Sequence, residues 1–130
     1  PGLQALKVRE GRDDNERTRD ITLRLLDEHP DLEGLYNAGG GNRGVISALE
    51  ERGVARQVTF IAHELTPYTR RALLDGTIDA LIAQNPGHEI RSAVRVLKAL
   101  IDGTPVIAEQ ERIGIDIFLP GNLPPDDAKT

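Results

Sequence analysis

The sequence predicts an α/β fold in which helices flank a mainly parallel sheet. Short apolar runs alternate along the chain with longer segments whose apolar residues recur at helical spacing. The breaks between them are rich in Gly, Pro, Asn and Asp, which favour turns and helix ends. Alternation of strands and helices is typical of sheets with parallel strands. No internal repeat or low-complexity linker divides the 130 residues, so one domain is expected.

The first half of the chain is predicted to alternate strands with helices. Apolar runs suited to strands lie at residues 3–8, 32–36 and 58–62. A first helix is expected to begin after Asp13 or Asp14 as N-cap and to end near His29, ahead of a proline. A second helix follows a glycine-rich loop and ends at Gly53, a favourable C-terminal residue. The run at 58–62 is almost entirely apolar, which predicts a strand buried on both faces.

The second half continues the alternation. Thr66 and Pro67 form an N-cap and first-turn pair that begins a helix ending at Gly76. The expected elements after it are a strand at residues 78–83, a long helix ending near residue 101 and a last strand at residues 113–119. Residues 120–130 contain three prolines and no apolar pattern, which predicts an extended or disordered tail.

Composition excludes several functions. Lys and Arg total 16 and Asp and Glu total 21, so the net charge is −5 and the chain is a poor nucleic-acid binder by itself. Cysteine is absent, which removes thiol catalysis and Cys-ligated zinc. No apolar run is long enough to span a membrane. His29, His63 and His88 lack the spacing of metal ligands, and no catalytic set stands out, so we expect no metal site and no enzyme.

Polar residues follow the predicted strands at the places where ligands bind in parallel sheets, beyond the carboxyl ends. Asn37 follows the second strand, His63 and Glu64 follow the third, and Gln84 follows the fourth. These side chains meet at one edge of the sheet, where they can hydrogen-bond to a polar small molecule. The alternative is that each of them only caps a strand end or the helix that follows it.

The glycine-rich loop supports a second hypothesis. Gly39, Gly41 and Gly44 satisfy the G-x-G-x-x-G pattern between a strand and a helix, and Glu64 lies 20 residues further on. Backbone amides at the start of such a helix can hold a pyrophosphate. A dinucleotide-binding oxidoreductase domain is therefore an alternative. Against it, a strand and a full helix precede the loop. The other interpretation is that the three glycines only permit a tight turn and close packing of the helix on the sheet.

Several short sequence motifs occur along the chain in the same order as in a known protein family. They are residues 25–31 (LLDEHPD), 48–53 (ALEERG), 58–64 (VTFIAHE), Gln84, 115–119 (IDIFL) and 122–124 (NLP). From about residue 11 to residue 124 the sequence resembles the C-terminal half of the effector-binding core of LacI-type transcriptional regulators. These regulators share the periplasmic sugar-binding-protein type I fold, so the resemblance implies one lobe of that fold.

The resemblance implies roles for the four strand-end residues. Glu64 takes the place of the family's strand-end Asp and would accept hydrogen bonds from ligand hydroxyls, whereas His63 stands where an aromatic residue is usual. Asn37 would donate and accept at the cleft, although the family's Asn-Asp pair aligns with the next two residues. Gln84 would lie on the hinge strand. A carboxylate and two amides suit a sugar or polyol.

The resemblance also implies partners and a setting. Such regulators bind DNA through a separate N-terminal helix-turn-helix domain. The expected protein is then a cytoplasmic, non-enzymatic sensor of a sugar-like effector, with no cofactor. A periplasmic sugar-binding transport receptor has the same fold and is the alternative.

The domain organisation follows from the same comparison. Residues 1–119 are expected to form the effector-binding lobe, of which residues 85–119 would cross back to a first lobe that this sequence does not contain. We expect 85–119 to repack on their own sheet or to pair with a second copy in a swapped homodimer. A start at Pro1 without any Met suggests a processed, trimmed or fragmentary chain.

Overall fold

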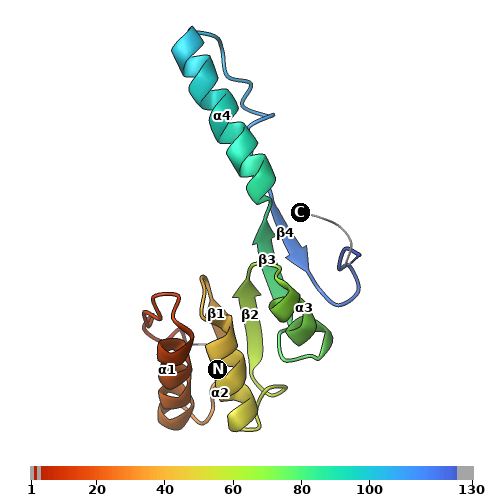
Figure 1. Ribbon diagram of the computed structural model, residues 1–130. Helices are drawn as coiled ribbons and strands as arrows, with labels where there is room; N and C mark the ends of the chain where they lie inside the picture. Colours follow the sequence, from red (N-terminus) through yellow and green to blue (C-terminus); the bar gives the residue numbers. More distant parts are fainter. Residues whose placement is uncertain (1, 3, 126–130) are drawn as a thin grey trace.

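The structure is a computed structural model that describes residue 2 and residues 4–125 (Figure 1). Its elements are α1 (Asn15–Glu28), β1 (Gly34–Asn37), α2 (Asn42–Glu51), β2 (Thr59–His63), α3 (Pro67–Leu74), β3 (Ala80–Gln84), α4 (Pro86–Asp102) and β4 (Ile115–Phe118). Each lies within or close to a segment that the sequence pattern predicts.

The strands form one sheet in the order β1-β2-β3-β4. β1, β2 and β3 are parallel, and β4 runs antiparallel to β3 at the edge. Tyr36 lies opposite Ile61, and Ile82 lies between His63 on one side and Ile117 on the other. The prediction of an α/β fold with a mainly parallel sheet is confirmed.

The hydrophobic core lies between one face of the sheet and the layer formed by α1, α2 and α3 (Figure 1). Its largest fully buried side chains are Phe60, Leu49, Leu73, Ile78 and Leu81. Alternate residues of each strand point into this core and the others point away from it. β2 is therefore buried on one face only, in contrast to the prediction from its apolar sequence.

The ends of the helices follow from local sequence. The Asp14 side chain accepts a hydrogen bond from the Arg17 N–H at 2.7 Å and caps α1. Thr66 and Thr69 form a reciprocal capping box at the start of α3. α4 ends at Gly103 in the left-handed conformation, with φ of 65°. These local signals were sufficient to predict where the helices begin and end.

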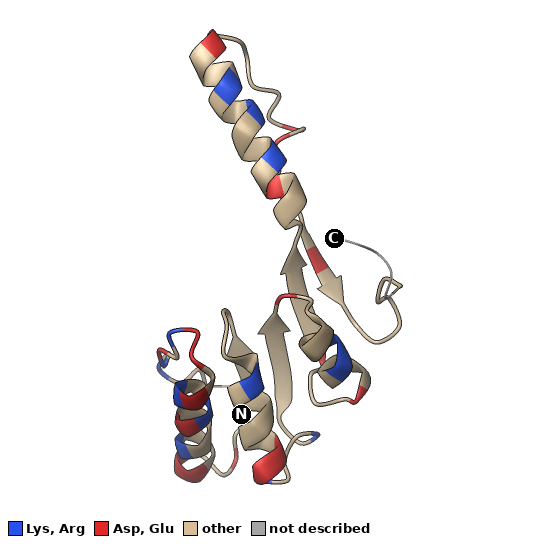
Figure 2. Cartoon of the chain, viewed as in Figure 1, with Lys and Arg blue, Asp and Glu red and all other residues tan. Residues whose placement is uncertain are grey.

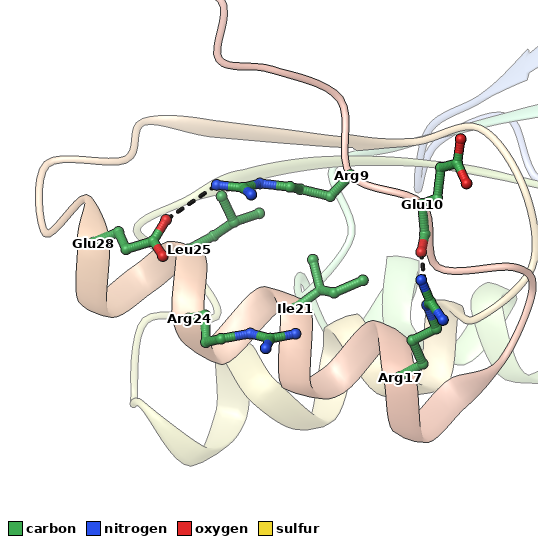
Figure 3. Close-up of a pocket in the computed structure, with 7 residues that line it drawn as sticks. All are labelled: Arg9, Glu10, Arg17, Ile21, Arg24, Leu25 and Glu28. Atoms are coloured by element: carbon green, nitrogen blue, oxygen red, sulfur yellow. Dashed lines mark hydrogen bonds and ion pairs between the residues drawn. The ribbon is translucent and has the colours of Figure 1, made fainter.

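The prediction of a strand at residues 3–8 is wrong over residues 4–8, which are the ones that the structure describes. Residues 4–8 are irregular, and Leu3 lies outside the described residues. The adjoining residues attach to α1 instead: Arg9 pairs with Glu28 at 3.1 Å, and the Arg17 side chain donates to the Glu10 carbonyl at 2.8 Å (Figure 3). A cavity of about 630 Å³ separates residues 4–9 from β1, so the segment has no neighbouring strand with which to pair.

Residues 85–119 have two parts with different positions. α4 projects away from the body of the molecule, and the chain then returns along it to β4 (Figure 1). Glu111 in the returning segment accepts two hydrogen bonds of 2.7 Å from Arg95. β4 thus rejoins the sheet, whereas α4 does not repack on it. Asn85 is the single residue between β3 and α4, and its side chain caps the helix by accepting a hydrogen bond from the His88 N–H at 2.9 Å.

The C-terminal residues of the described chain form a turn after β4. The Asn122 side chain accepts from the Leu119 N–H at 2.7 Å and donates to the Ile117 carbonyl at 2.9 Å. Leu123 packs against the core. Residues 126–130 of the expected tail lie outside the described residues. Of the helices described, none has the length and apolarity that a membrane crossing requires.

Candidate ligand-binding site

A cavity of about 590 Å³ lies at the carboxyl ends of β1 and β2. The loops after both strands and the first turns of α2 and α3 line it, together with the start of α1. This is the edge of the sheet at which ligands bind in parallel α/β folds. His63 and Glu64 are among its lining residues.

Asn37 organises the loop that forms one wall of the cavity. Its side-chain amide nitrogen lies 3.1 Å and 2.8 Å from the carbonyl oxygens of Gly39 and Gly40. It also lies 2.7 Å from Oδ1 of Asn42, whose own amide donates to the His63 carbonyl at 2.9 Å. The two asparagines thereby connect the end of β1, the start of α2 and the end of β2. The Asn37 nitrogen is used within this network, so it positions the wall.

His63 lies between the cavity and the outer face of the sheet. Its Nε2 is 2.6 Å from the hydroxyl of Tyr36 on β1. The two rings meet edge to face, with centroids 5.5 Å apart and an interplanar angle of 62°. Tyr36 was not a candidate from the sequence. Together the two side chains offer an aromatic surface and a hydrogen-bonding pair at the strand ends.

Glu64 presents its carboxylate to the cavity. Its backbone has φ of 67°, a left-handed conformation that is uncommon for a residue other than glycine. Its N–H donates to the Ile82 carbonyl at 2.9 Å, which fixes the turn after β2 to β3. Within the described part of the chain, no residue hydrogen-bonds to the Glu64 carboxylate, and the residue is exposed. The carboxylate is available to a ligand.

Gln84 lies apart from the other three predicted residues. It ends β3, pairs with Ile115 of β4 and is exposed, but it does not line the cavity. The residue after it begins the connection to α4. The structure therefore places His63 and Glu64 in the lining of the cavity, Asn37 in the network that holds its wall, and Gln84 at the base of α4.

Asp13 is a site residue that sequence reasoning missed. Its carboxylate accepts a hydrogen bond from the Gly40 N–H at 2.6 Å and lines the cavity. Arg12 and Asp13 both have positive φ, 53° and 56°, so the turn before α1 holds a strained conformation that aims this carboxylate at the loop. From the sequence, Asp13 was expected only as one of two candidates for the N-cap of the first helix. The contact joins residues 27 apart, and no local pattern reveals it.

Arg43 and Tyr68 form a second wall that sequence reasoning missed. The Arg43 guanidinium carbon lies 4.7 Å from the centroid of the Tyr68 ring, in a cation–π contact. The two residues lie in the first turns of α2 and α3 and both line the cavity. They add a donor and an aromatic ring to a cavity that the carboxylates of Asp13 and Glu64 also line.

The glycines of the loop have structural roles. Gly41 is the N-cap of α2 with φ of 81°. A Cβ on Gly44 would lie 2.0 Å from the Asn15 carbonyl oxygen, so glycine permits the close approach of α2 to α1. The Asp13 carboxylate already occupies the Gly40 N–H, and a negative charge at that point disfavours a pyrophosphate. This geometry counts against the dinucleotide hypothesis.

The described residues contain no group of three or more His, Asp and Glu side chains arranged to hold a metal ion. A separate hollow of about 490 Å³ runs along α1, with Ile21 and Leu25 at its floor and Arg24 at its side (Figure 3). It lies away from the strand ends. The polar chemistry suited to a small ligand is therefore gathered in the cavity at the carboxyl ends of β1 and β2.

The fold and the cavity define a ligand-binding α/β lobe whose polar side chains lie at the strand ends. The sequence matches the family described as the periplasmic binding protein domain over residues 1–105. The chain belongs to this family. No curated protein matches the sequence.

Solved structures show the same fold. A glucose-galactose binding protein, GanP of Geobacillus stearothermophilus, is 22% identical with a TM-score of 0.80, over 88% of this chain and 41% of its own. An ABC transporter solute-binding protein of Agrobacterium vitis with bound D-fucose is 20% identical with a TM-score of 0.81, over 97% and 43%. A periplasmic component of a sugar transport system from Hahella chejuensis is 29% identical with a TM-score of 0.70, over 80% and 38%. The chain spans about two-fifths of the length of these proteins.

Proposed function

We propose that this chain is a sugar-binding lobe of a periplasmic transport receptor, with its ligand in the cavity at the ends of β1 and β2. The observation that carries the proposal is the free carboxylate of Glu64 beside His63, Arg43 and Tyr68 around a cavity of about 590 Å³. A carboxylate accepts from sugar hydroxyls, a guanidinium donates to sugar oxygens, and an aromatic ring packs on the apolar side of a sugar ring.

The similar solved structures support a sugar as the ligand class. Their descriptions name glucose and galactose, D-fucose and D-arabinose. Several of them are described as binding proteins or components of sugar or carbohydrate transport systems, which favours transport over regulation. In this proposal the chain binds its ligand without transforming it, and neither a metal nor a cofactor takes part.

A transcriptional regulator of the LacI type is the second candidate. The NLP phrase that carries part of this resemblance forms an ordered turn, in which Asn122 bonds to Leu119 and Ile117. Such a regulator would be cytoplasmic and would bind DNA through a separate helix-turn-helix domain. The coding sequence upstream of Pro1 separates the two candidates: a secretory signal supports the receptor, and a helix-turn-helix supports the regulator.

Sugar binding is tested by NMR titration of the isotope-labelled chain with D-galactose, D-glucose, D-fucose and D-arabinose. We expect amide shifts confined to residues 38–43 and 63–69, with weak affinity because one lobe supplies only part of the contacts. Glu64→Gln should weaken binding about tenfold through loss of a charged acceptor. Glu50→Gln, an exposed acid on α2 outside the cavity, is the matched control. Saturable binding of NAD with no response to any sugar would overturn the proposal.

A further inference from the structure

The hydroxyl of Tyr36 contacts the ring of His63 across two neighbouring strands. Tyr36 lies opposite Ile61 in the pairing of β1 with β2, and His63 follows Ile61 by two residues, so it lies on the same face of the sheet. The hydroxyl oxygen is 2.6 Å from Nε2 of His63. Figure 2 shows no charged residue on β1 or β2, so no charge within either strand competes for this contact. The contact bears on which nitrogen of His63 is left for a ligand.

The length of this hydrogen bond indicates that the tyrosine is the donor. A bond in which N–H donates to oxygen is usually about 2.9–3.0 Å long, whereas an O–H donor gives about 2.7–2.8 Å. The 2.6 Å between Tyr36 and His63 fits an O–H donor. A neutral imidazole has one nitrogen that donates and one that accepts. An O–H donor requires Nε2 to be without a hydrogen, and the hydrogen of a neutral ring is then on Nδ1.

The main chain of His63 is held in place as well as its ring. The His63 carbonyl accepts from the Asn42 side chain at 2.9 Å, and the N–H of the next residue, Glu64, donates to the Ile82 carbonyl at 2.9 Å. Within the described part of the chain, no residue other than Tyr36 hydrogen-bonds to the His63 ring. Nδ1 is therefore left for a ligand, in a residue that lines the cavity.

We propose that Tyr36 is a positioning residue, which holds the ring hydrogen of His63 on Nδ1 so that this nitrogen donates to the ligand. This inference rests on the proposed function, because the ligand is the sugar in the cavity at the ends of β1 and β2. In water a histidine ring carries its hydrogen mainly on Nε2, so Tyr36 selects the less common form. The donor is then already in place when the sugar arrives, and binding loses no free energy in selecting it.

The fixed ring form places a donor and an acceptor on consecutive residues. Nδ1 of His63 donates, whereas the ionised carboxylate of Glu64 only accepts. Both residues line the cavity. Two neighbouring oxygens of a sugar match this pair, because one oxygen accepts from His63 and the hydroxyl of the other donates to Glu64. The pair therefore favours a polyol over a ligand that offers only donors or only acceptors.

The position of the ring hydrogen is measured by NMR on the chain without ligand, at about pH 8, where an ordinary imidazole is neutral. Correlations between the ring protons and ring nitrogens should place the hydrogen of His63 mainly on Nδ1. Tyr36→Phe, which keeps the ring and removes the hydroxyl, should move it mainly to Nε2. His29 at the end of α1 is the internal reference, and its signals should not change. A wild-type His63 ring in any other state, or a Tyr36→Phe ring unchanged from it, would overturn the proposal.

Titration with D-galactose tests whether this hydrogen serves the ligand. Tyr36→Phe should weaken binding about fivefold, because the donor is no longer held in place. In a His63→Phe chain, which has no ring nitrogen, the same substitution should have almost no further effect. Equal weakening in both chains would show that Tyr36 acts without His63 and would overturn the positioning role. A chain that binds no sugar contradicts the proposed function, whereas normal sugar binding that Tyr36→Phe leaves unchanged contradicts only the role of Tyr36.

Discussion

Two adjacent acids at the start of α1 have different tasks. Asp14 caps the helix through the Arg17 N–H, whereas Asp13 reaches the Gly40 N–H in the wall of the cavity. Asp13→Ala should therefore raise the hydrogen-exchange rate of the Gly40 amide about tenfold, because the amide loses its charged acceptor. Asp14→Ala is the matched control and should cost about 1 kcal/mol of stability without exposing Gly40. Equal effects of the two variants on the Gly40 amide would contradict these separate roles.

Gly44 sets the distance between α1 and α2. A Cβ there would lie 2.0 Å from the Asn15 carbonyl oxygen and 2.7 Å from the Arg19 backbone nitrogen, and neither backbone can move alone. Gly44→Ala should destabilise the chain by about 3 kcal/mol, measured by urea unfolding. Gly114→Ala is the control, because nothing lies within 4 Å of its added Cβ, and it should be nearly neutral. A stable Gly44→Ala variant would show that the helices can separate.

At the scale of the elements, one ion pair holds the returning segment against α4. Hydrogen bonds from Arg95, followed by Ser92, lower the pKa of Glu111 to about 2. In the unfolded chain the pKa of a Glu carboxyl is about 4.3, above its value in the folded chain. Such a carboxyl stabilises the fold fully at pH values above about 4.3. It loses this contribution as the pH falls toward the folded pKa. The attachment should therefore be complete at neutral pH and should weaken between about pH 4.3 and about pH 2.

The measurement is the NMR signal intensity of the amides at residues 107–112 during acid titration. Signals of the returning segment should broaden in that pH interval, before those of the core strands. Glu111→Gln should remove the pH dependence and leave the segment loosely attached already at neutral pH. A transition near neutral pH instead would assign the effect to a histidine and contradict the role of Glu111.

The elements whose signals are local were predictable, and those that depend on distant partners were not. Caps and turn residues such as Asp14, Thr66 and Gly103 determine helix ends from neighbouring residues alone. The segment at residues 4–8 has a strand-like composition but forms no strand, because pairing requires a neighbour that it lacks. The apolar run of β2 predicted burial on both faces, and in the single chain only one face is buried.

In the candidate site, too, residues marked by local sequence were predictable and residues that depend on distant contacts were not. The rule that ligands bind beyond parallel strand ends predicts Asn37, His63 and Glu64 from the sequence, and His63 and Glu64 line the cavity at the ends of β1 and β2. The rule could not distinguish Gln84 from these residues. Gln84 ends the strand that leads into α4, and it does not line the cavity. Asp13 joins the site through a contact between residues 27 apart. Such a contact depends on how α1 packs beside the loop, which no local pattern encodes.

At the scale of the whole molecule, the projecting helix α4 gives the chain an elongated shape (Figure 1). A compact chain of 130 residues has a radius of gyration of about 14 Å, and the projecting α4 makes a lone copy larger than that. Small-angle scattering from the monomeric chain, isolated by size-exclusion chromatography, should therefore give a value above about 14 Å and an extended tail in the distance distribution. A compact profile, with a radius of gyration near about 14 Å, would mean that α4 folds back onto the sheet of its own chain.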